Sequence, residues 1–85
     1  MIDNMDLIWI NSARYIGDYR LALSFSDGKE RVVDVKDFIA SHPSFSPLQD
    51  KQLFSQFQLD GWTVSWQDGT LDIAPEYLYE IGNPV

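Results

Sequence analysis

Cysteine is absent from the 85-residue sequence, and histidine occurs once, as His42. Without cysteine the chain has no disulfide, no thiol nucleophile and no cysteine-ligated metal site. A single histidine beside Pro43 lacks the partner that nucleophilic catalysis requires, so a loop or packing role is the simpler interpretation. The sequence also has no phosphate-binding glycine loop and no EF-hand spacing. We therefore predict a protein that is not an enzyme and has no cofactor.

Long apolar runs are missing as well. The apolar run at residues 7–10 is too short for a signal-peptide core or a membrane span. Asp3 and Asp6 lie where a signal peptide needs positive charge. We expect a cytoplasmic protein with no membrane association.

Basic residues are scarce, and their distribution is uneven. The chain has 6 Lys and Arg against 13 Asp and Glu, for a net charge of −7. Residues 1–36 hold five basic and six acidic side chains, whereas residues 37–85 hold only Lys51 against seven acidic ones. Phosphate backbones are bound chiefly through Lys and Arg, so direct nucleic-acid binding is disfavoured. The charge fits a basic protein partner, although acidic surfaces also serve solubility alone.

The clearest structural signal is a β-hairpin at residues 21–35, where apolar side chains alternate on both sides of Asp27-Gly28. A two-residue loop would place Asp34 beside the apolar row, opposite Leu21. A three-residue loop, 26–28, keeps that row apolar and puts Gly28 in the left-handed conformation. The predicted pairs are Leu21–Val33, Tyr19–Val35 and Arg20–Asp34.

Three elements are predicted around this hairpin. Residues 5–15 contain a first strand, which we expect to be central or covered on both sides because both faces are apolar. These faces carry Leu7 and Trp9 on one side and Ile8 and Ile10 on the other. Residues 36–40 form a short helical turn that ends before Pro43. A helix at about 47–57 begins with Ser46 as its cap.

A second hairpin and a last helix follow. A two-residue turn, Asp68-Gly69, pairs Trp66 with Leu71 and suits a type I′ conformation. Pro75 opens the last helix, Gly82 ends it, and residues 83–85 are a tail. The element order predicts a single α+β domain, residues 1–85. We expect a small, mostly antiparallel sheet built on two β-hairpins, with two helices packed on it.

Two groups of side chains in the C-terminal half are candidates for a site. Asp72, Glu76 and Glu80 are spaced four apart and could hold a divalent cation or do acid–base work, although capping and helix-dipole roles are the favoured explanation. Tyr77 and Tyr79 point about 200° apart on a helix, so both cannot face the core. One of them, together with Trp66, could form an aromatic partner-binding patch instead of core.

The sequence also carries four motifs in a fixed order. They are Leu21-x-Leu23-x-Phe25-x-Asp27-Gly28 followed by Val32-Val33-Asp34-Val35; Pro47-Leu48 with Asp50 and Leu53-Phe54; Val64-x-Trp66 with Asp68-Gly69; and Asp72-Ile73-Ala74-Pro75-Glu76-x-Leu78-Tyr79-Glu80. In this order and spacing the chain resembles the small bacterial domain-of-unknown-function family 2442, over about residues 6–80, with 81–85 as a tail.

The resemblance implies an α+β fold related to the N-terminal domain of a protein whose C-terminal part is a helix-turn-helix. It implies no established activity, and it hints at paired, toxin–antitoxin-like modules in bacteria or phages. Since the sequence ends just after the last motif, we expect no appended DNA-binding domain.

Taken together, these patterns favour a non-enzymatic protein-interaction or regulatory module. Its partner would bind the acidic, aromatic C-terminal half or an exposed sheet edge, where a homodimer could also form. The partner-binding candidates are Trp66, Asp72, Glu76, Tyr77, Tyr79 and Glu80. The alternative is a small-ligand or divalent-metal-binding domain, or an unrecognised enzyme, that uses Asp72, Glu76 and Tyr79.

Overall fold

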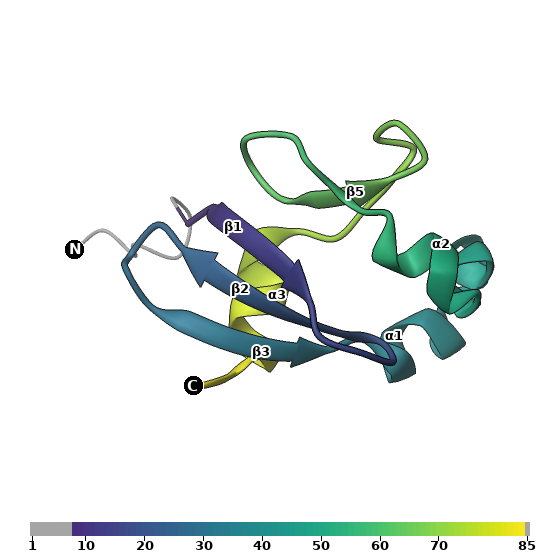
Figure 1. Cartoon of the computed structure of the whole chain (residues 1–85), viewed down its shortest axis with the longest axis horizontal. Helices are drawn as coiled ribbons and strands as arrows, with labels where there is room; N and C mark the ends of the chain where they lie inside the picture. Colours follow the sequence, from purple (N-terminus) through teal and green to yellow (C-terminus); the bar gives the residue numbers. More distant parts are fainter. Residues whose placement is uncertain (1–7, 85) are drawn as a thin grey trace.

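Two antiparallel sheets and a set of short helices make up the computed structural model, which describes residues 8–84 (Figure 1). In chain order the elements are β1 (Ile10–Tyr15), β2 (Arg20–Phe25), β3 (Glu30–Asp34), α1 (Lys36–Ser41), the 3-10 helix η2 (Pro43–Gln49), α2 (Lys51–Ser55), β4 (Gln58–Leu59), β5 (Val64–Trp66), β6 (Leu71–Asp72), α3 (Pro75–Ile81) and β7 (Asn83–Pro84). Helix α3 lies behind the larger sheet in Figure 1, and α1 and α2 lie at one end of it.

The strand orders are β1-β2-β3-β7 in the larger sheet and β4-β5-β6 in the smaller one. This arrangement confirms the α+β class, with the difference that the second hairpin forms its own small sheet. Its strands are only two or three residues long. The N–H of Ile10, at the start of β1, donates to the carbonyl of Trp62 at 3.0 Å and so links the two sheets.

The first hairpin has the predicted register. Leu21 pairs with Val33 and Arg20 with Asp34. The N–H of Phe25 donates to the carbonyl of Lys29 at 2.9 Å, which closes a three-residue loop. Gly28 has a φ of 87°, in the left-handed region where a side chain would be strained.

The second hairpin also has the predicted register, with Trp66 opposite Leu71. Asp68 and Gly69 both have positive φ, 58° and 87°, as a type I′ turn requires. The N–H of Thr70 donates to the carbonyl of Gln67 at 3.1 Å and closes the two-residue turn.

The core lies between the inner face of the larger sheet, α3 and the smaller sheet. Its fully buried side chains include Leu21, Leu23, Phe25, Val33, Phe54, Val64, Trp66 and Leu78. The indole ring of Trp66 stacks on Phe54 with ring centres 5.5 Å apart. Its Nε1–H donates to the Phe54 carbonyl at 2.8 Å, so the one polar atom of this buried ring has a partner.

The prediction of a helix at about 47–57 is wrong about its first residue and about its capping residue. Residues 43–49 form the 3-10 helix η2, and Pro47 lies inside it. Asp50, not Ser46, caps the following helix α2, because its Oδ1 accepts from the N–H of Gln52 at 2.9 Å. An aspartate in extended conformation satisfies a free helical N–H as well as serine does, so it restarts the helix here.

The prediction of a central first strand is also wrong, because β1 is an edge of the larger sheet. Ile8 and Ile10 are buried, but Trp9 between them is 40% exposed. The ring of Trp62 stacks on the ring of Trp9, with centres 6.5 Å apart. The expectations for Met5 and Leu7 lie outside the described residues.

At the C-terminus, α3 begins at Pro75 and ends before Gly82, as expected. Residues 83–84, expected to be part of a tail, form β7. Val32 of β3 pairs with Asn83 in an antiparallel ladder. β7 therefore covers part of the edge of the larger sheet opposite β1.

Candidate functional site

The predicted site residue Trp66 is 0% exposed. Its ring and its Nε1–H are both used within the core, against Phe54. A fully buried ring has no surface to offer a partner, so Trp66 does not belong to an exposed aromatic patch.

Tyr79 serves as a link between α3 and the first hairpin. Its hydroxyl donates to Asp27 Oδ2 at 2.6 Å, and its ring packs edge-on against Phe25 with centres 5.0 Å apart. The guanidinium carbon of Arg31 lies 4.1 Å from the ring centre. The hydrogen bond from Tyr79 lowers the pKa of Asp27, and the backbone N–H of Lys29 adds to this effect. These contacts give Tyr79 a structural role.

The remaining predicted residues are spread over β6 and α3. Asp72 and Glu80 are exposed, and Glu76 is half-buried in the first turn of α3. Tyr77 is 39% exposed and tilts against Phe38 with ring centres 5.3 Å apart. Within residues 8–84, no three His, Cys, Asp or Glu side chains are placed to hold a metal ion.

The most prominent exposed feature is a pair of tryptophans that we did not predict. Trp9 and Trp62 stack with ring centres 6.5 Å apart and an interplanar angle of 25°. They are 40% and 45% exposed. We call these two residues the tryptophan pair. Large aromatic side chains left in solvent mark interaction surfaces more often than isolated small apolar ones do.

Backbone and side-chain hydrogen bonds hold the first ring of the tryptophan pair. The N–H of Trp9 donates to Ser26 Oγ at 3.1 Å, and the Ser26 N–H donates to the Trp9 carbonyl at 2.8 Å. The indole Nε1–H of Trp9 donates to Asn11 Oδ1 at 3.1 Å. The first hairpin therefore holds the Trp9 backbone and Asn11 of β1 holds the Trp9 ring before any partner binds.

The second ring of the tryptophan pair, Trp62, follows a tight turn formed by Asp60 and Gly61. Asp60 Oδ1 accepts from the N–H groups of Trp62 and Thr63, each at 2.9 Å. These two hydrogen bonds lower the pKa of Asp60, so its carboxylate is charged at neutral pH. Gly61, with a φ of 88°, completes the turn. The sequence signal for this turn was Asp60-Gly61 directly before Trp62, which places Trp62 ahead of the strand and not in it.

An open hollow of about 600 Å³ lies next to this turn, on the smaller sheet. It is lined by Gln58, Leu59, Asp60, Ser65, Asp68 and Gly69. Leu59 is exposed, and the hollow contains two carboxylates and no basic side chain. This part of the surface therefore combines apolar area with negative charge.

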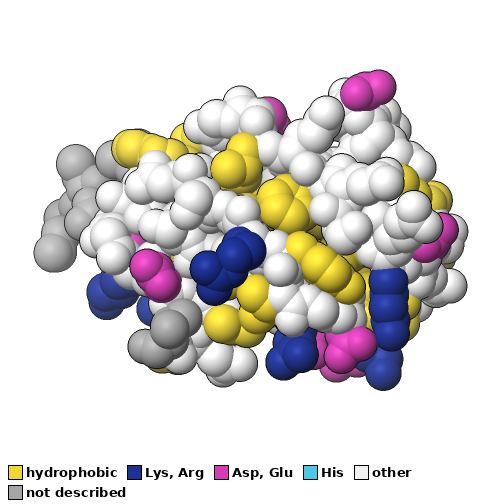
Figure 2. Space-filling view, in the orientation of Figure 1, with side chains coloured by type: hydrophobic (Ala, Val, Ile, Leu, Met, Phe, Trp, Pro, Cys, Tyr) yellow, Lys and Arg dark blue, Asp and Glu magenta, His cyan; other side chains and the backbone are white. Residues whose placement is uncertain are grey.

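Basic side chains lie on another part of the molecule. Since Leu21 and Leu23 face the core, Ala22 between them points to the open face of the larger sheet. Arg14 lies opposite Ala22 and shares that face, as does Arg20 two residues before Ala22. Figure 2 shows this face with several Lys and Arg side chains among hydrophobic ones, and with Asp or Glu side chains next to some of them.

Comparison with solved structures finds the same fold in a crystal structure of a "putative DNA binding protein" from Nitrosomonas europaea, with a TM-score of 0.73 and 22% sequence identity. The match covers 87% of this chain and 48% of that one, so the chain spans about half the length of that protein. No curated protein is significantly similar to the chain.

This comparison contradicts our prediction that nucleic-acid binding is disfavoured. The solved structure that shares this fold is that of a "putative DNA binding protein", and this finding conflicts with our expectation. Net charge is a property of the whole chain, whereas Arg14 and Arg20 are placed together on one sheet face.

In the part of the chain from residue 8 to residue 84, no helix has the length and apolar character needed to cross a membrane.

The family comparison agrees with the four sequence motifs. The model of a family described as "Protein of unknown function (DUF2442)" matches residues 10–84, which is nearly the whole chain. That description assigns the family no catalytic activity. The chain therefore belongs to the DUF2442 family of proteins of unknown function.

Proposed function

We propose that this protein is a non-enzymatic interaction module with a regulatory role, as a small protein of a toxin–antitoxin-like pair would have. The observation that carries the proposal is the tryptophan pair, Trp9 and Trp62, stacked and 40% and 45% exposed. Tryptophan is the residue type most enriched among those that dominate binding energy at protein interfaces. A partner would cover both rings.

The chemistry around the pair suggests what the partner offers. Asp60 belongs to the same turn as Trp62, and Asp68 lines the hollow beside it. Arg and Lys side chains bind aromatic faces through cation–π contacts and pair with carboxylates. We therefore infer a protein segment that carries apolar and cationic side chains together.

The proposal is tested by comparing what co-purifies with matched variants from the cells that produce the protein. The Trp9→Ser/Trp62→Ser variant should lose a partner that the wild type retains. Tyr77→Ser is the control, since Tyr77 is similarly exposed, at 39%, but lies on α3. Loss of the same partner from the Tyr77 variant alone would assign the surface to α3 and contradict the proposal.

A second candidate function is nucleic-acid binding by the open face of the larger sheet. It is favoured by the description of the Nitrosomonas europaea protein as a "putative DNA binding protein" and by the placement of Arg14 and Arg20 on one face. Fluorescence anisotropy with a labelled DNA duplex tests it. Arg14→Gln should weaken binding and reduce the salt slope by about one phosphate contact, whereas Lys51→Gln on α2 should not. An unchanged anisotropy at low salt would rule this function out.

The alternative site around Asp72, Glu76 and Tyr79 receives less support. The Tyr79 hydroxyl is engaged with Asp27, and Asp72 belongs to a strand while Glu76 belongs to a helix. A melting screen with divalent cations tests it, because a ligand at 100 times its Kd stabilises a protein by about 2.7 kcal/mol.

A further inference from the structure

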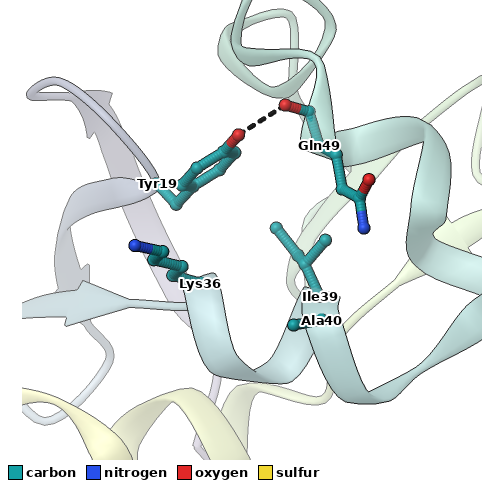
Figure 3. Close-up of a pocket in the computed structure, with 5 residues that line it drawn as sticks. All are labelled: Tyr19, Lys36, Ile39, Ala40 and Gln49. Carbon is teal, nitrogen blue, oxygen red and sulfur yellow. Dashed lines mark hydrogen bonds between the residues drawn. The ribbon is translucent and has the colours of Figure 1, made fainter.

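A cavity of about 370 Å³ lies where the beginning of β2 meets α1 and η2 (Figure 3). It is lined by Tyr19, Lys36, Ile39, Ala40 and Gln49. Its volume falls within the range of small-molecule sites, at the lower end. The cavity lies at the far end of β1 from Trp9, so it is separate from the tryptophan pair.

The shape of this cavity is fixed by side chains that are held on both sides. Ile39 is 3% exposed and belongs to the core, so the apolar lining that a ligand can reach comes from the half-buried Tyr19 and the exposed Ala40. The hydroxyl of Tyr19 donates to the backbone carbonyl of Gln49, which ties the hairpin to η2 across the cavity, as Figure 3 shows. Tyr19 also packs edge-on against the buried Phe54, with ring centres 5.7 Å apart. One aromatic ring and one aliphatic side chain therefore border a space that exists before a ligand binds.

The polar groups of the cavity are a cation and an amide. Lys36 lies at the rim and Gln49 across from it in Figure 3. The chain has 13 Asp and Glu, yet none of them lines this cavity. Within the described part of the chain, no carboxylate oxygen lies within 4.0 Å of the Lys36 ammonium. The neighbouring Lys51, by contrast, is paired with Asp18 at 3.2 Å.

We propose that this cavity binds a small organic carboxylate with an aromatic or aliphatic body. The carboxylate pairs with the Lys36 ammonium, and the apolar body contacts Tyr19 and Ala40, which line the same cavity. A charge-assisted hydrogen bond to the Lys36 ammonium favours an anion over a neutral molecule of the same shape.

Titration of the ¹⁵N-labelled chain, followed by amide NMR spectra, tests this proposal with three probes. Benzoate has both the charge and the apolar body, benzamide lacks the charge, and inorganic phosphate lacks the apolar body. Benzoate should shift the amide signals of Tyr19, Lys36, Ile39, Ala40 and Gln49 in a saturable way. Benzamide and phosphate should bind at least about tenfold more weakly. No saturable shift with benzoate, or equal shifts with all three probes, would overturn the proposal.

A pair of lysine variants provides the second readout. Lys36→Met keeps the unbranched side chain at nearly its full length and removes its charge, and it should weaken benzoate binding about tenfold. Lys29→Met, an exposed lysine beside the turn of the first hairpin, is the matched control and should leave benzoate binding unchanged. Because Lys36 and Lys29 are both exposed, neither substitution disturbs the core. Equal weakening by both variants would contradict a specific role for Lys36.

Discussion

The hydroxyl of Tyr79 on α3 donates a 2.6 Å hydrogen bond to Asp27 in the turn of the first hairpin, 52 residues away. This contact joins the last helix of the chain to its best-defined hairpin. Phe25 and Arg31 pack against the same tyrosine ring. The C-terminal helix is therefore anchored by one aromatic side chain with three kinds of contact.

Removal of the Tyr79 hydroxyl should weaken the contact between α3 and the first hairpin without changing the packing of the Tyr79 ring. We expect Tyr79→Phe to reduce the free energy of unfolding by about 1 kcal/mol, because the ring stays in place and one hydrogen bond to a charged group is lost. Urea denaturation followed by circular dichroism measures it. Tyr77→Phe is the control, since within the described residues the Tyr77 hydroxyl has no such partner, and it should change the stability little.

The same contact makes stability depend on pH. The pKa of Asp27 is lower in the folded chain than in the unfolded chain, so the folded state binds fewer protons. The stabilisation is full above the pKa that Asp27 has when unfolded, and it is lost as the pH falls through the folded pKa, below about pH 4. Urea midpoints measured across this range should fall less steeply in Tyr79→Phe than in the wild type. Identical slopes would show that Tyr79 does not set this pKa. The pKa of Asp60 is also lowered in the folded chain, so Asp60 makes stability fall with falling pH in both the wild type and Tyr79→Phe.

Substitution of two of the tryptophans should reduce stability by clearly different amounts. Trp66→Phe removes a buried donor and leaves the Phe54 carbonyl unpaired, so we expect a loss of about 2–4 kcal/mol. Trp62→Phe changes a ring that is 45% exposed and should cost less than about 1 kcal/mol. Thermal or urea unfolding distinguishes the two. A large loss from the Trp62 substitution would mean that this ring is part of the core.

Gly82 is required for close packing of β7 on β3. Its φ of −71° is open to any residue, but a Cβ at this position would lie 2.8 Å from the Cβ of Arg31. Gly82→Ala must therefore move the strand away, at a cost of about 1–3 kcal/mol. Amide hydrogen exchange should show loss of protection in the β3–β7 ladder. The neighbouring substitution Asn83→Ala, at an exposed position, should retain it.

Local signals were sufficient to predict both hairpins. In the first, only one register kept Asp34 away from the apolar row, and the structure has that register. In the second, Asp68-Gly69 favoured a type I′ turn, and both residues have positive φ. These signals are complete within about fifteen residues of sequence, so no knowledge of the tertiary fold was needed.

The candidate site depended on tertiary contacts and was predicted less well. Trp66 and Trp62 look alike in the alternating pattern of the second hairpin, yet one is buried and the other is half exposed. The difference arises because Asp60 forms a turn that takes Trp62 out of the strand and brings it beside Trp9, 53 positions earlier in the chain. Pairing across such a distance cannot be read from periodicity. The cavity at Tyr19 and Lys36 likewise joins segments that the sequence does not bring together.

Site-specific photo-crosslinking from position 62 tests the proposed function most directly. A photoreactive phenylalanine derivative replaces Trp62 in the cells that produce the protein, and the same residue replaces Tyr77 in a control. We predict a covalent adduct with a second, different protein from position 62 and none from position 77, with the adduct lost when Trp9→Ser is added. An adduct from position 77 alone, or no adduct from position 62, would contradict the assignment of the tryptophan pair as the interaction surface.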